Sequence, residues 1–328
     1  MMSIQFSQNL RSFSHFKEKG CFSRVSLKPF TTLKAGGEAE WFYTASFSDQ
    51  LSRIAAEAHQ TGIQMTILGS GSNILPSDKG VPGLVIYNKA QKLEIKEDGE
   101  VIADAGCSFQ ELFLKSAQAG LKGLEFAVGI PGTLGGALVS NAGAYRSNIS
   151  EFLTELEVVY QGEREWVKPS WMGFSYRNSV LRSKDLPQCT VVRVKMHLDK
   201  GNPKTIYDLA REYQRQRISK QPSQASAGSF FKNIYNYKLA QELETLPSSL
   251  KESGVIPAGY LLMQAGLAGF AQEGAMFSLK HSNFVVNVGN ASAFAIRRLA
   301  EFAKKRVEEE FCVRLEEEVL YLGDWSHF

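Results

Sequence analysis

The sequence predicts an α+β fold made of two or three domains. Its 328 residues are enough for more than one hydrophobic core, and 44% hydrophobic with 22% charged residues is ordinary for a globular protein. Segments typical of strands and of helices alternate along the chain, without an internal repeat. The net charge of +3, from 37 basic and 34 acidic residues, is too small to indicate nucleic acid or an anionic membrane as partner.

The first third reads as strand, helix, strand, loop and strand. Strand character in AEWFYTAS is followed by a helix over residues 48–62, in which Leu51, Ile54, Ala55 and Ala58 share one face. Ser48 is the expected N-cap and Gly62 the stop. IQMTIL and GLVIYN then read as strands on either side of a glycine-rich loop.

The middle and last parts are also mixed. We expect a capped helix from Ser108 to Gly120, strands in ELEVVY and TVVRVKMHL, and a polar helix over residues 203–220 that QPSQASAG breaks. In the final third, SAFAIRRLAEFAKKRVEEEF predicts a helix and VRLEEEVLYLG a closing strand. The apolar stripe of that helix contains Phe294, Leu299, Phe302, Ala303 and Val307.

Cysteine spacing and the amino terminus bear on the compartment. Cys21, Cys107, Cys189 and Cys312 lie far apart without a C-x-x-C pair, so neither a metal site nor a disulfide framework is indicated, and we expect buried thiols. The first 20 residues lack the apolar core of a signal peptide, and no run approaches the roughly 18 apolar residues of a membrane span. We therefore expect a cytoplasmic protein.

LGSGSNILPSDKG, residues 68–80, resembles a phosphate cradle but matches neither common type. A Rossmann fingerprint opens a helix, which Pro76, Gly80 and Pro82 disfavour here, and a Walker A loop needs a G-K-[ST] triplet that the chain lacks. A cradle would therefore hold phosphate with backbone N–H groups and the hydroxyls of Ser70 and Ser72. A glycine-rich hairpin without a ligand is the alternative.

A second glycine cluster, GLEFAVGIPGTLGGALVSNAGAY over residues 123–145, favours the cradle. It has too many glycines for a core helix and too few charges for a surface loop, and such density lets backbone approach a flat or anionic ligand. One dinucleotide would explain both clusters.

Seven motifs together resemble the UDP-N-acetylenolpyruvoylglucosamine reductase family, in its shorter subtype. They are TTLKAGGEAEWF, LGSGSNIL, the second glycine cluster, FSYRNSVL, AGSFFKN, KHSNFVVNVG and LEEEVLYLG, in the family's order from about Thr31 to Gly323. The resemblance implies an FAD-binding portion of the vanillyl-alcohol-oxidase and para-cresol-methylhydroxylase type, built from two α+β subdomains (1–88 and 89–200), and an α+β substrate-binding domain (201–328). It also implies noncovalent FAD, because no histidine or cysteine sits where it would tether the ring. The implied cofactor-binding residues are Leu68, Gly69, Ser70, Gly71, Ser72, Asn73, Gly129, Pro131, Gly132, Thr133, Gly136, Ala137, Asn141, Ala142 and Gly143.

The implied reaction reduces an enolpyruvyl ether to a lactyl ether in two halves, with NADPH as hydride donor to FAD. By resemblance, Ser229 donates the proton, Arg177 stabilises the growing charge on the substrate carboxylate, and Glu318 assists. On a strand, Glu318 would also share a face with Leu320 and Leu322 and point inward. The alternatives are a structural serine in a turn, a surface arginine and a solvated run of glutamates.

The same motifs supply candidates for binding a UDP-sugar substrate, although a structural histidine is the usual role of a residue placed like His281. The candidates are Tyr176, Lys232, Asn233, Lys280, His281 and Asn283. The chain departs from the family pattern at Arg146, where glycine is common, at Met276, where glutamine is common, and after FFKN, where a proline is missing. The competing hypotheses are a flavin-dependent alcohol or sugar oxidase and a noncatalytic flavin-binding protein, and we expect a monomer.

Overall fold

The computed structural model describes residues 20–183, 189–326 and 328, so the expectation about the amino terminus lies outside the described residues. The chain forms two compact units. Unit 1 comprises Met1–Ser26, Glu38–Ser70 and Val81–Arg215, and unit 2 comprises Leu27–Gly37, Gly71–Gly80 and Gln216–Phe328. The expected domain boundaries after residues 88 and 200 stay predictions.

Unit 1 contains a four-stranded sheet in the order β1-β2-β5-β3, with β1 antiparallel to β2 and the other pairs parallel. Its strands are β1 (Phe22–Ser26), β2 (Glu38–Ala45), β5 (Val81–Asn88) and β3 (Met65–Leu68). Helix α2 (Ser48–Gln60) buries Leu51, Ile54, Ala55 and Ala58, as predicted. The expected cap is wrong by one residue, because Phe47 is the N-cap and Ser48 opens the helix. Helix α2 ends just before Gly62, whose φ is +66°.

The second sheet of unit 1 is antiparallel, in the order β12-β11-β13-β7-β6, and α2 packs against it as well. Its strands are β12 (Glu163–Val167), β11 (Leu153–Tyr160), β13 (Cys189–His197), β7 (Glu100–Asp104) and β6 (Leu93–Ile95). Helix α3 (Phe109–Gln118) begins as predicted, with the Ser108 hydroxyl accepting from the Glu111 N–H at 3.3 Å. The remaining elements of this part are β8 (Leu121–Lys122), α4 (Leu134–Val139), β9 (Gly143–Ala144), β10 (Ser147–Asn148), β14 (Asp199–Lys200) and the 3₁₀ turns η2 (Glu125–Ala127), η3 (Ile149–Phe152), η4 (Pro169–Met172) and η5 (Val180–Arg182). Helix α5 (Pro203–Lys220) belongs to unit 1 up to Arg215, and its last residues belong to unit 2.

A buried carboxylate joins neighbouring strands of this second sheet. Glu157, 4% exposed, accepts hydrogen bonds from the guanidiniums of Arg164 and Arg193. Burial by itself would raise the pKa of Glu157, but the two arginines outweigh it and hold that pKa below its ordinary value. The network therefore stabilises the folded sheet while Glu157 is ionised.

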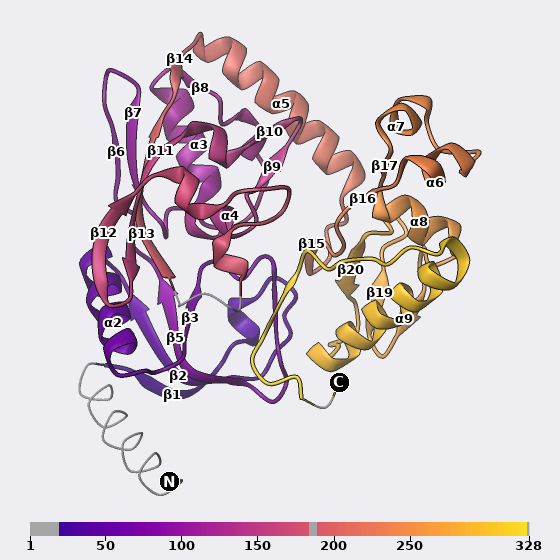
Figure 1. Ribbon diagram of the computed structural model, residues 1–328, viewed down its shortest axis with the longest axis horizontal. Helices are drawn as coiled ribbons and strands as arrows, with labels where there is room; N and C mark the ends of the chain where they lie inside the picture. The colour runs from indigo at the N-terminus through magenta and orange to yellow at the C-terminus, as the bar shows by residue number, and fades with distance from the viewer. Residues whose placement is uncertain (1–19, 184–188, 327) are drawn as a thin grey trace, which may run out of the picture. The chain divides into compact units, whose positions relative to one another are not determined.

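Unit 2 has a four-stranded sheet in the order β15-β20-β19-β18, with α9 packed against β18 and β19. Figure 1 shows α9 beside β19. The sheet strands are β15 (Ser226–Ser229), β20 (Phe284–Asn287), β19 (Ala275–Phe277) and β18 (Ala271–Gln272). A separate parallel pair joins β4 (Ile74–Pro76) to β21 (Leu320–Leu322). The other elements are η1 (Lys28–Phe30), β16 (Ile234–Tyr235), α6 (Tyr237–Glu242), α7 (Ser248–Ser253), β17 (Val255–Ile256), α8 (Ala258–Gln264) and α9 (Ala293–Phe311).

Helix α9 follows the predicted stripe only in part. Leu299, Ala303 and Val307 are buried, whereas Phe294 and Phe302 are each 38% exposed. The two phenylalanines instead contact other aromatic rings near the surface: Phe302 stacks on Phe270, and Phe294 meets the edge of Phe328. The buried face of α9 is therefore displaced from the predicted stripe, toward Ala295, Ile296 and Ala300.

The cysteines correct one expectation. All four are free thiols, but only Cys21 and Cys107 are buried, Cys189 is half-buried and Cys312 is exposed. Burial raises the pKa of Cys107 and of Cys189 to about 12. Cys312 is the C-cap of α9 and has a left-handed conformation, with φ +55°.

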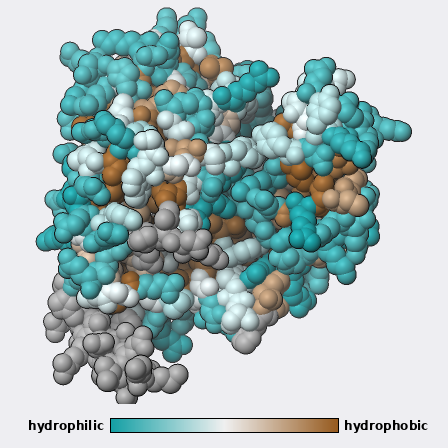
Figure 2. Space-filling view, in the orientation of Figure 1, coloured by the Kyte–Doolittle hydropathy of each residue, from teal (hydrophilic) through white to brown (hydrophobic). Residues whose placement is uncertain are grey.

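Side chains on the face in Figure 2 are mainly hydrophilic, with apolar residues exposed in scattered places. In residues 20–183 and 189–326, no helix is both long and apolar enough to cross a membrane. The same residues hold no cluster of three or more histidine, cysteine, aspartate or glutamate side chains that could bind a metal ion.

Candidate functional site

The two glycine-rich segments meet within unit 1. Strand β3 ends at the buried Leu68, and a Cβ added to the next residue, Gly69, would lie 2.4 Å from the Thr133 Oγ1. That hydroxyl also accepts from the Gly136 N–H at 3.2 Å, at the start of α4. Glycine at position 69 therefore lets the first loop pack directly on the second cluster.

The second cluster leaves backbone accessible. It does form a short helix, α4, but Gly129 and Gly136 are exposed, and a Cβ on Gly136 would meet only the Thr133 Oγ1, at 3.4 Å. Gly129 and Gly132 have positive φ angles of +71° and +135°. Pro131 is also exposed, and Ala137 is buried.

The end of the cluster turns back in a tight hairpin, β9–β10. Tyr145 and Arg146, its two central residues, both have positive φ, +54° and +67°, which is the geometry of a type I′ turn. Arg146 thus occupies a left-handed position that favours glycine. The Tyr145 ring stacks on Tyr213 of α5 at 3.7 Å between centroids, and its hydroxyl donates to the Tyr213 carbonyl at 3.0 Å. These contacts offset part of the free-energy cost of the two positive φ angles in the turn.

Arg177 lies over the same cluster. It sits in a tight turn closed by the Ser175–Asn178 bridge, has φ +52°, and donates from its guanidinium to the Gly143 carbonyl at 2.9 Å. Its guanidinium lies 5.4 Å from the centre of the exposed Tyr176 ring. The turn is tied down by the buried Asn141, whose amide nitrogen donates to the Ser175 carbonyl at 3.4 Å. In unit 1 the structure therefore brings Arg177 and Tyr176 next to Asn141, Ala142 and Gly143.

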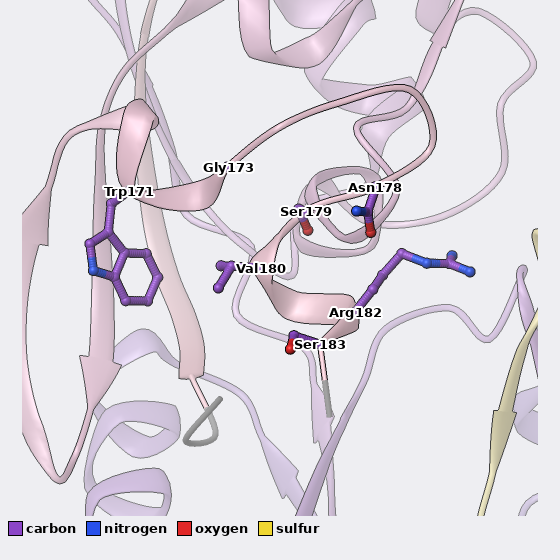
Figure 3. Close-up of a pocket in the computed structure, with 7 residues that line it drawn as sticks. All are labelled: Trp171, Gly173, Asn178, Ser179, Val180, Arg182 and Ser183. Carbon is purple, nitrogen blue, oxygen red and sulfur yellow. The ribbon is translucent and has the colours of Figure 1, made fainter. Parts of the chain in front are cut away.

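A surface hollow lies beside this turn, between η4 and η5 (Figure 3). Trp171 and Val180 face each other across it, while the Arg182 guanidinium points away from the indole. Ser179 donates its hydroxyl hydrogen bond to the Val139 carbonyl at 2.8 Å. The lining offers no convergent charged groups, so we assign it no part in the predicted chemistry.

The second half of the first loop belongs to unit 2. Gly71 has φ +62°, and a Cβ there would lie 1.9 Å from the Phe30 carbonyl oxygen. The Gly71 carbonyl accepts from the Thr32 N–H at 3.1 Å. Ser72 and Asn73 follow as a half-buried turn that leads into β4. No side chain other than hydrogen fits at Gly71 without moving this turn.

Unit 2 also brings together Ser229 and Glu318, which are far apart in the sequence. Three backbone contacts align the two segments: Glu318 N–H donates to the Phe230 carbonyl at 2.8 Å, Lys232 N–H donates to the Glu316 carbonyl at 2.8 Å, and Phe231 bridges Glu317. Ser229 ends β15 after a register shift against β20, and Gly228 before it has φ +78° with no atom within 4 Å of an added Cβ. Ser229 is thus a half-buried residue next to open space.

The three adjacent glutamates have different environments. Glu316 is exposed and pairs with the Lys232 ammonium at 3.2 Å, whereas Glu317 pairs with Lys304 at 3.0 Å. Glu318 is half-buried. The parity argument for it is wrong, because β21 begins only at Leu320 and Glu318 lies in a bend before the strand. Its position follows from the backbone bonds to Phe230 and Asn73 instead.

The candidates for substrate contact that lie in unit 2 already have protein partners. Asn283, 3% exposed, uses its side-chain amide to bind both the N–H and the carbonyl of Phe231. Asn233 accepts from the Ala258 N–H at the start of α8, and the Lys280 ammonium donates to the Ile218 carbonyl at 2.7 Å. Their assignment as substrate ligands stays a prediction.

The position of His281 disfavours the charged form of its ring. Burial lowers the pKa of His281, and its Nδ1 accepts from the Asn283 N–H at 3.3 Å. The remaining nitrogen, Nε2, then carries the proton and can donate to an anionic ligand.

Tyr213 is a contact that the sequence analysis missed. It lies on α5, which was predicted only as a polar helix, yet Ile206, Ala210 and Tyr213 recur at spacings of four and three residues. That spacing places them on one helical face, and Ile206 and Ala210 are indeed buried. This helical spacing was the signal in the sequence that could have predicted the contact made by Tyr213.

Comparison with known protein families shows to which class of protein the chain belongs. Residues 41–167 match the FAD binding domain, and residues 221–322 match the C-terminal domain of UDP-N-acetylenolpyruvoylglucosamine reductase. The chain is therefore an FAD-binding oxidoreductase, with the α+β fold expected for that class.

Individual relatives then identify the family. The chain is 36% identical over 306 residues to the UDP-N-acetylenolpyruvoylglucosamine reductase of Synechococcus sp. strain JA-3-3Ab, covering 92% of this chain and 91% of that one. It is 35% identical over 310 residues to the reductase of Caldanaerobacter subterraneus, covering 94% and 95%. The crystal structure of the reductase (MurB) from Thermus caldophilus is similar with a TM-score of 0.73 and 34% identity, over 92% of this chain and 98% of that one. The chain belongs to the UDP-N-acetylenolpyruvoylglucosamine reductase family.

The residues present fit FAD. Within unit 1, Gly129 and Gly136 leave backbone exposed, and Gly69 lets the first loop pack on Thr133. Exposed backbone with few charges suits a flat, anionic dinucleotide. FAD and NADPH are the cofactors of the family.

Proposed function

We propose that this protein reduces the enolpyruvyl ether of UDP-N-acetylglucosamine to UDP-N-acetylmuramate, a step of peptidoglycan precursor synthesis. The observation that carries the proposal is the backbone pairing of residues 230–232 with residues 316–318, which makes Ser229 and Glu318 neighbours in a chain of this family. A serine and a glutamate on adjoining segments suit a site that delivers one proton. Bound FAD supplies a hydride carrier between NADPH and the substrate.

Proton delivery is the task of Ser229. When hydride reaches the vinyl carbon distal to the ether oxygen, the electron pair of the double bond moves toward the carbon that bears the carboxylate. A proton must then reach that carbon to complete the lactyl ether. The Ser229 hydroxyl gives its proton there, because an enolate is a strong enough base to accept it once geometry is fixed, and solvent returns a proton to the serine.

Arg177 and Glu318 act on the substrate carboxylate. The guanidinium of Arg177 offers two parallel N–H donors to the carboxylate as its negative charge grows, for which a planar fork suits better than an ammonium. Its left-handed backbone and its bond to the Gly143 carbonyl hold it beside the segment assigned to the cofactor. Glu318 orients the Ser229 hydroxyl and the carboxylate end of the substrate.

The diphosphate and sugar bind through side chains of unit 2, and Tyr176 of unit 1 is a candidate by resemblance alone. Lys232 and Lys280 supply positive charge, His281 donates from Nε2, and Asn233 and Asn283 fix the backbone around them. We further propose that the protein acts in the cytoplasm as a monomer, without a nucleic-acid or membrane partner.

Anaerobic mixing tests the function. Protein reduced with NADPH is mixed with the enolpyruvyl sugar nucleotide, and return of flavin absorbance with formation of UDP-N-acetylmuramate is expected. The matched control is UDP-N-acetylglucosamine, which lacks the double bond and must leave the flavin reduced. A flavin that is reoxidised only by oxygen, together with oxidation of an added alcohol or sugar, would identify an oxidase instead.

A further inference from the structure

We propose that the side chain of Asn73 positions Glu318, so that this loop residue serves the substrate half of the reaction. The proposal rests on the proposed function and adds a positioning residue to it. Asn73 lies in the loop assigned to the cofactor, but its side-chain amide binds the protein: Nδ2 donates to the Glu318 carbonyl at 3.1 Å.

Asn73 holds residues 318–320 at two points. Besides the amide bond to Glu318, the Asn73 backbone carbonyl accepts from the Leu320 N–H at 3.0 Å. The parallel ladder between β4 and β21 starts at the next position, with Ile74 opposite Leu320. Asn73 therefore continues the ladder by one step, its side chain bonding a residue that lies outside the strand.

Glu318 depends on this bond because it lies in a bend. Its N–H is fixed by the Phe230 carbonyl at 2.8 Å, one residue after Ser229, and its carbonyl is fixed by Asn73. The neighbouring Val319 is 2% exposed and packs in the same core as Phe230, which has 0% exposure. With both backbone groups held and the next side chain buried, the direction of the Glu318 side chain is set relative to Ser229.

The glycine loop can hold Asn73 in place because contacts at Gly71 fix the loop itself. The Gly71 carbonyl accepts from Thr32, and Gly71 fits against the Phe30 carbonyl only because it lacks a Cβ. Asn73 follows Gly71 by two residues. The contacts that fix the glycine loop therefore also fix Asn73 and, through its side chain, Glu318. A shift of about 1 Å in a catalytic group costs up to about 100-fold in rate.

The test is a double-mutant cycle on the two half-reactions. Asn73→Ala is expected to slow reoxidation by the enolpyruvyl substrate by roughly 10- to 100-fold, with FAD content and flavin reduction by NADPH changed by less than about twofold. In the Glu318→Gln background the same substitution is expected to cost less than about threefold, because its target is already impaired. Asn73→Asp keeps the size of the side chain, removes the donor and is expected to act in the same direction.

Asn287→Ala is the matched control. Asn287 is also a half-buried asparagine of unit 2 that joins two segments, donating to the Leu33 carbonyl at 2.9 Å, and it does not contact Glu318. Its loss should lower the thermal midpoint as much as Asn73→Ala does while both half-reactions stay near those of the unmodified protein.

Two results would overturn the assignment. If Asn73→Ala slows reoxidation equally in the unmodified protein and in the Glu318→Gln background, Asn73 does not act through the Glu318 carboxylate. Loss of FAD or slowing of both halves would place its role at the cofactor. If the unmodified protein and Asn287→Ala both fail to react with the substrate, the proposed function itself is wrong, which separates the two failures.

Discussion

Gly71→Ala tests the claim that the first glycine loop is shaped by close backbone approach. The added Cβ would lie 1.9 Å from the Phe30 oxygen, and an ordinary contact needs 3.4 Å, so one segment must move by about 1.5 Å (3.4 − 1.9). The left-handed φ of +62° adds about 1 to 2 kcal/mol for any residue with a Cβ. We therefore expect a clear loss of stability and, because the displaced turn is part of the loop assigned to the cofactor, a lower FAD content.

Gly62→Ala provides the matched control for backbone strain alone. Gly62 has φ +66° but no atom within 4 Å of an added Cβ, so this variant should lose only about 1 to 2 kcal/mol and keep its FAD. The assay is thermal unfolding of both purified variants, together with the ratio of flavin to protein absorbance before and after dialysis. If the two variants lose equal stability and both retain FAD, the close approach at Gly71 has no consequence and the reasoning about the loop is refuted.

Three further predictions concern individual charged groups. Arg177→Lys keeps the positive charge but loses the planar fork, so reoxidation by substrate should slow by about 10²- to 10³-fold in stopped-flow absorbance with FAD retained; an unchanged rate would remove Arg177 from the site. Glu318→Gln should slow the same half-reaction substantially, whereas Glu316→Gln, at an exposed position, should change it by less than about twofold, and equal effects would contradict the distinction between them. Because the folded-state pKa of Glu157 lies below its unfolded value, its stabilisation is complete above the unfolded pKa of about 4.3 and is lost as pH falls through the folded value. Glu157→Gln should therefore cost about 1 to 3 kcal/mol at pH 7 and flatten the decline of the thermal midpoint below about pH 5; an unaltered pH profile would contradict this.

Local signals in the sequence predicted the elements whose causes are local. Helix α3 begins where Ser108 can cap it, and α2 buries the four predicted apolar residues and ends before Gly62. The absence of a helix after the first glycine loop is confirmed too, because β4 follows it. In each case the cause lies within a few residues of the element.

Features that depend on distant partners were not predictable in the same way. The closing strand was expected to include Glu318, but the segment bends there, because its bonds run to Phe230 and Asn73 instead of to one neighbouring strand. Strand parity was therefore the wrong argument for a residue that the family resemblance had already singled out. Helical spacing places Phe294 and Phe302 on the apolar stripe of the last helix, yet they pair with Phe328 and Phe270 near the surface.

The division of the first glycine loop is the least predictable feature. The sequence reads residues 68–73 as one cradle, whereas Leu68–Ser70 belong to unit 1 and Gly71–Asn73 to unit 2. Nothing local marks the change at Gly71, because its contacts are with Phe30 and Thr32, about 40 residues earlier. The link from this loop to Glu318 is visible only once those contacts are known.

The proton from Ser229 is the central chemical claim, and stopped-flow absorbance of Ser229→Ala tests it most directly. The substitution removes a hydroxyl without changing charge, and Ser226→Ala, on the same strand, is the matched control. The account predicts that NADPH reduces the flavin of both variants at nearly the unmodified rate. Reoxidation by the enolpyruvyl substrate should fall by roughly 10²- to 10⁴-fold in Ser229→Ala alone. Unchanged reoxidation in that variant, or an equal loss in both half-reactions, would contradict the assignment of Ser229 as the acid.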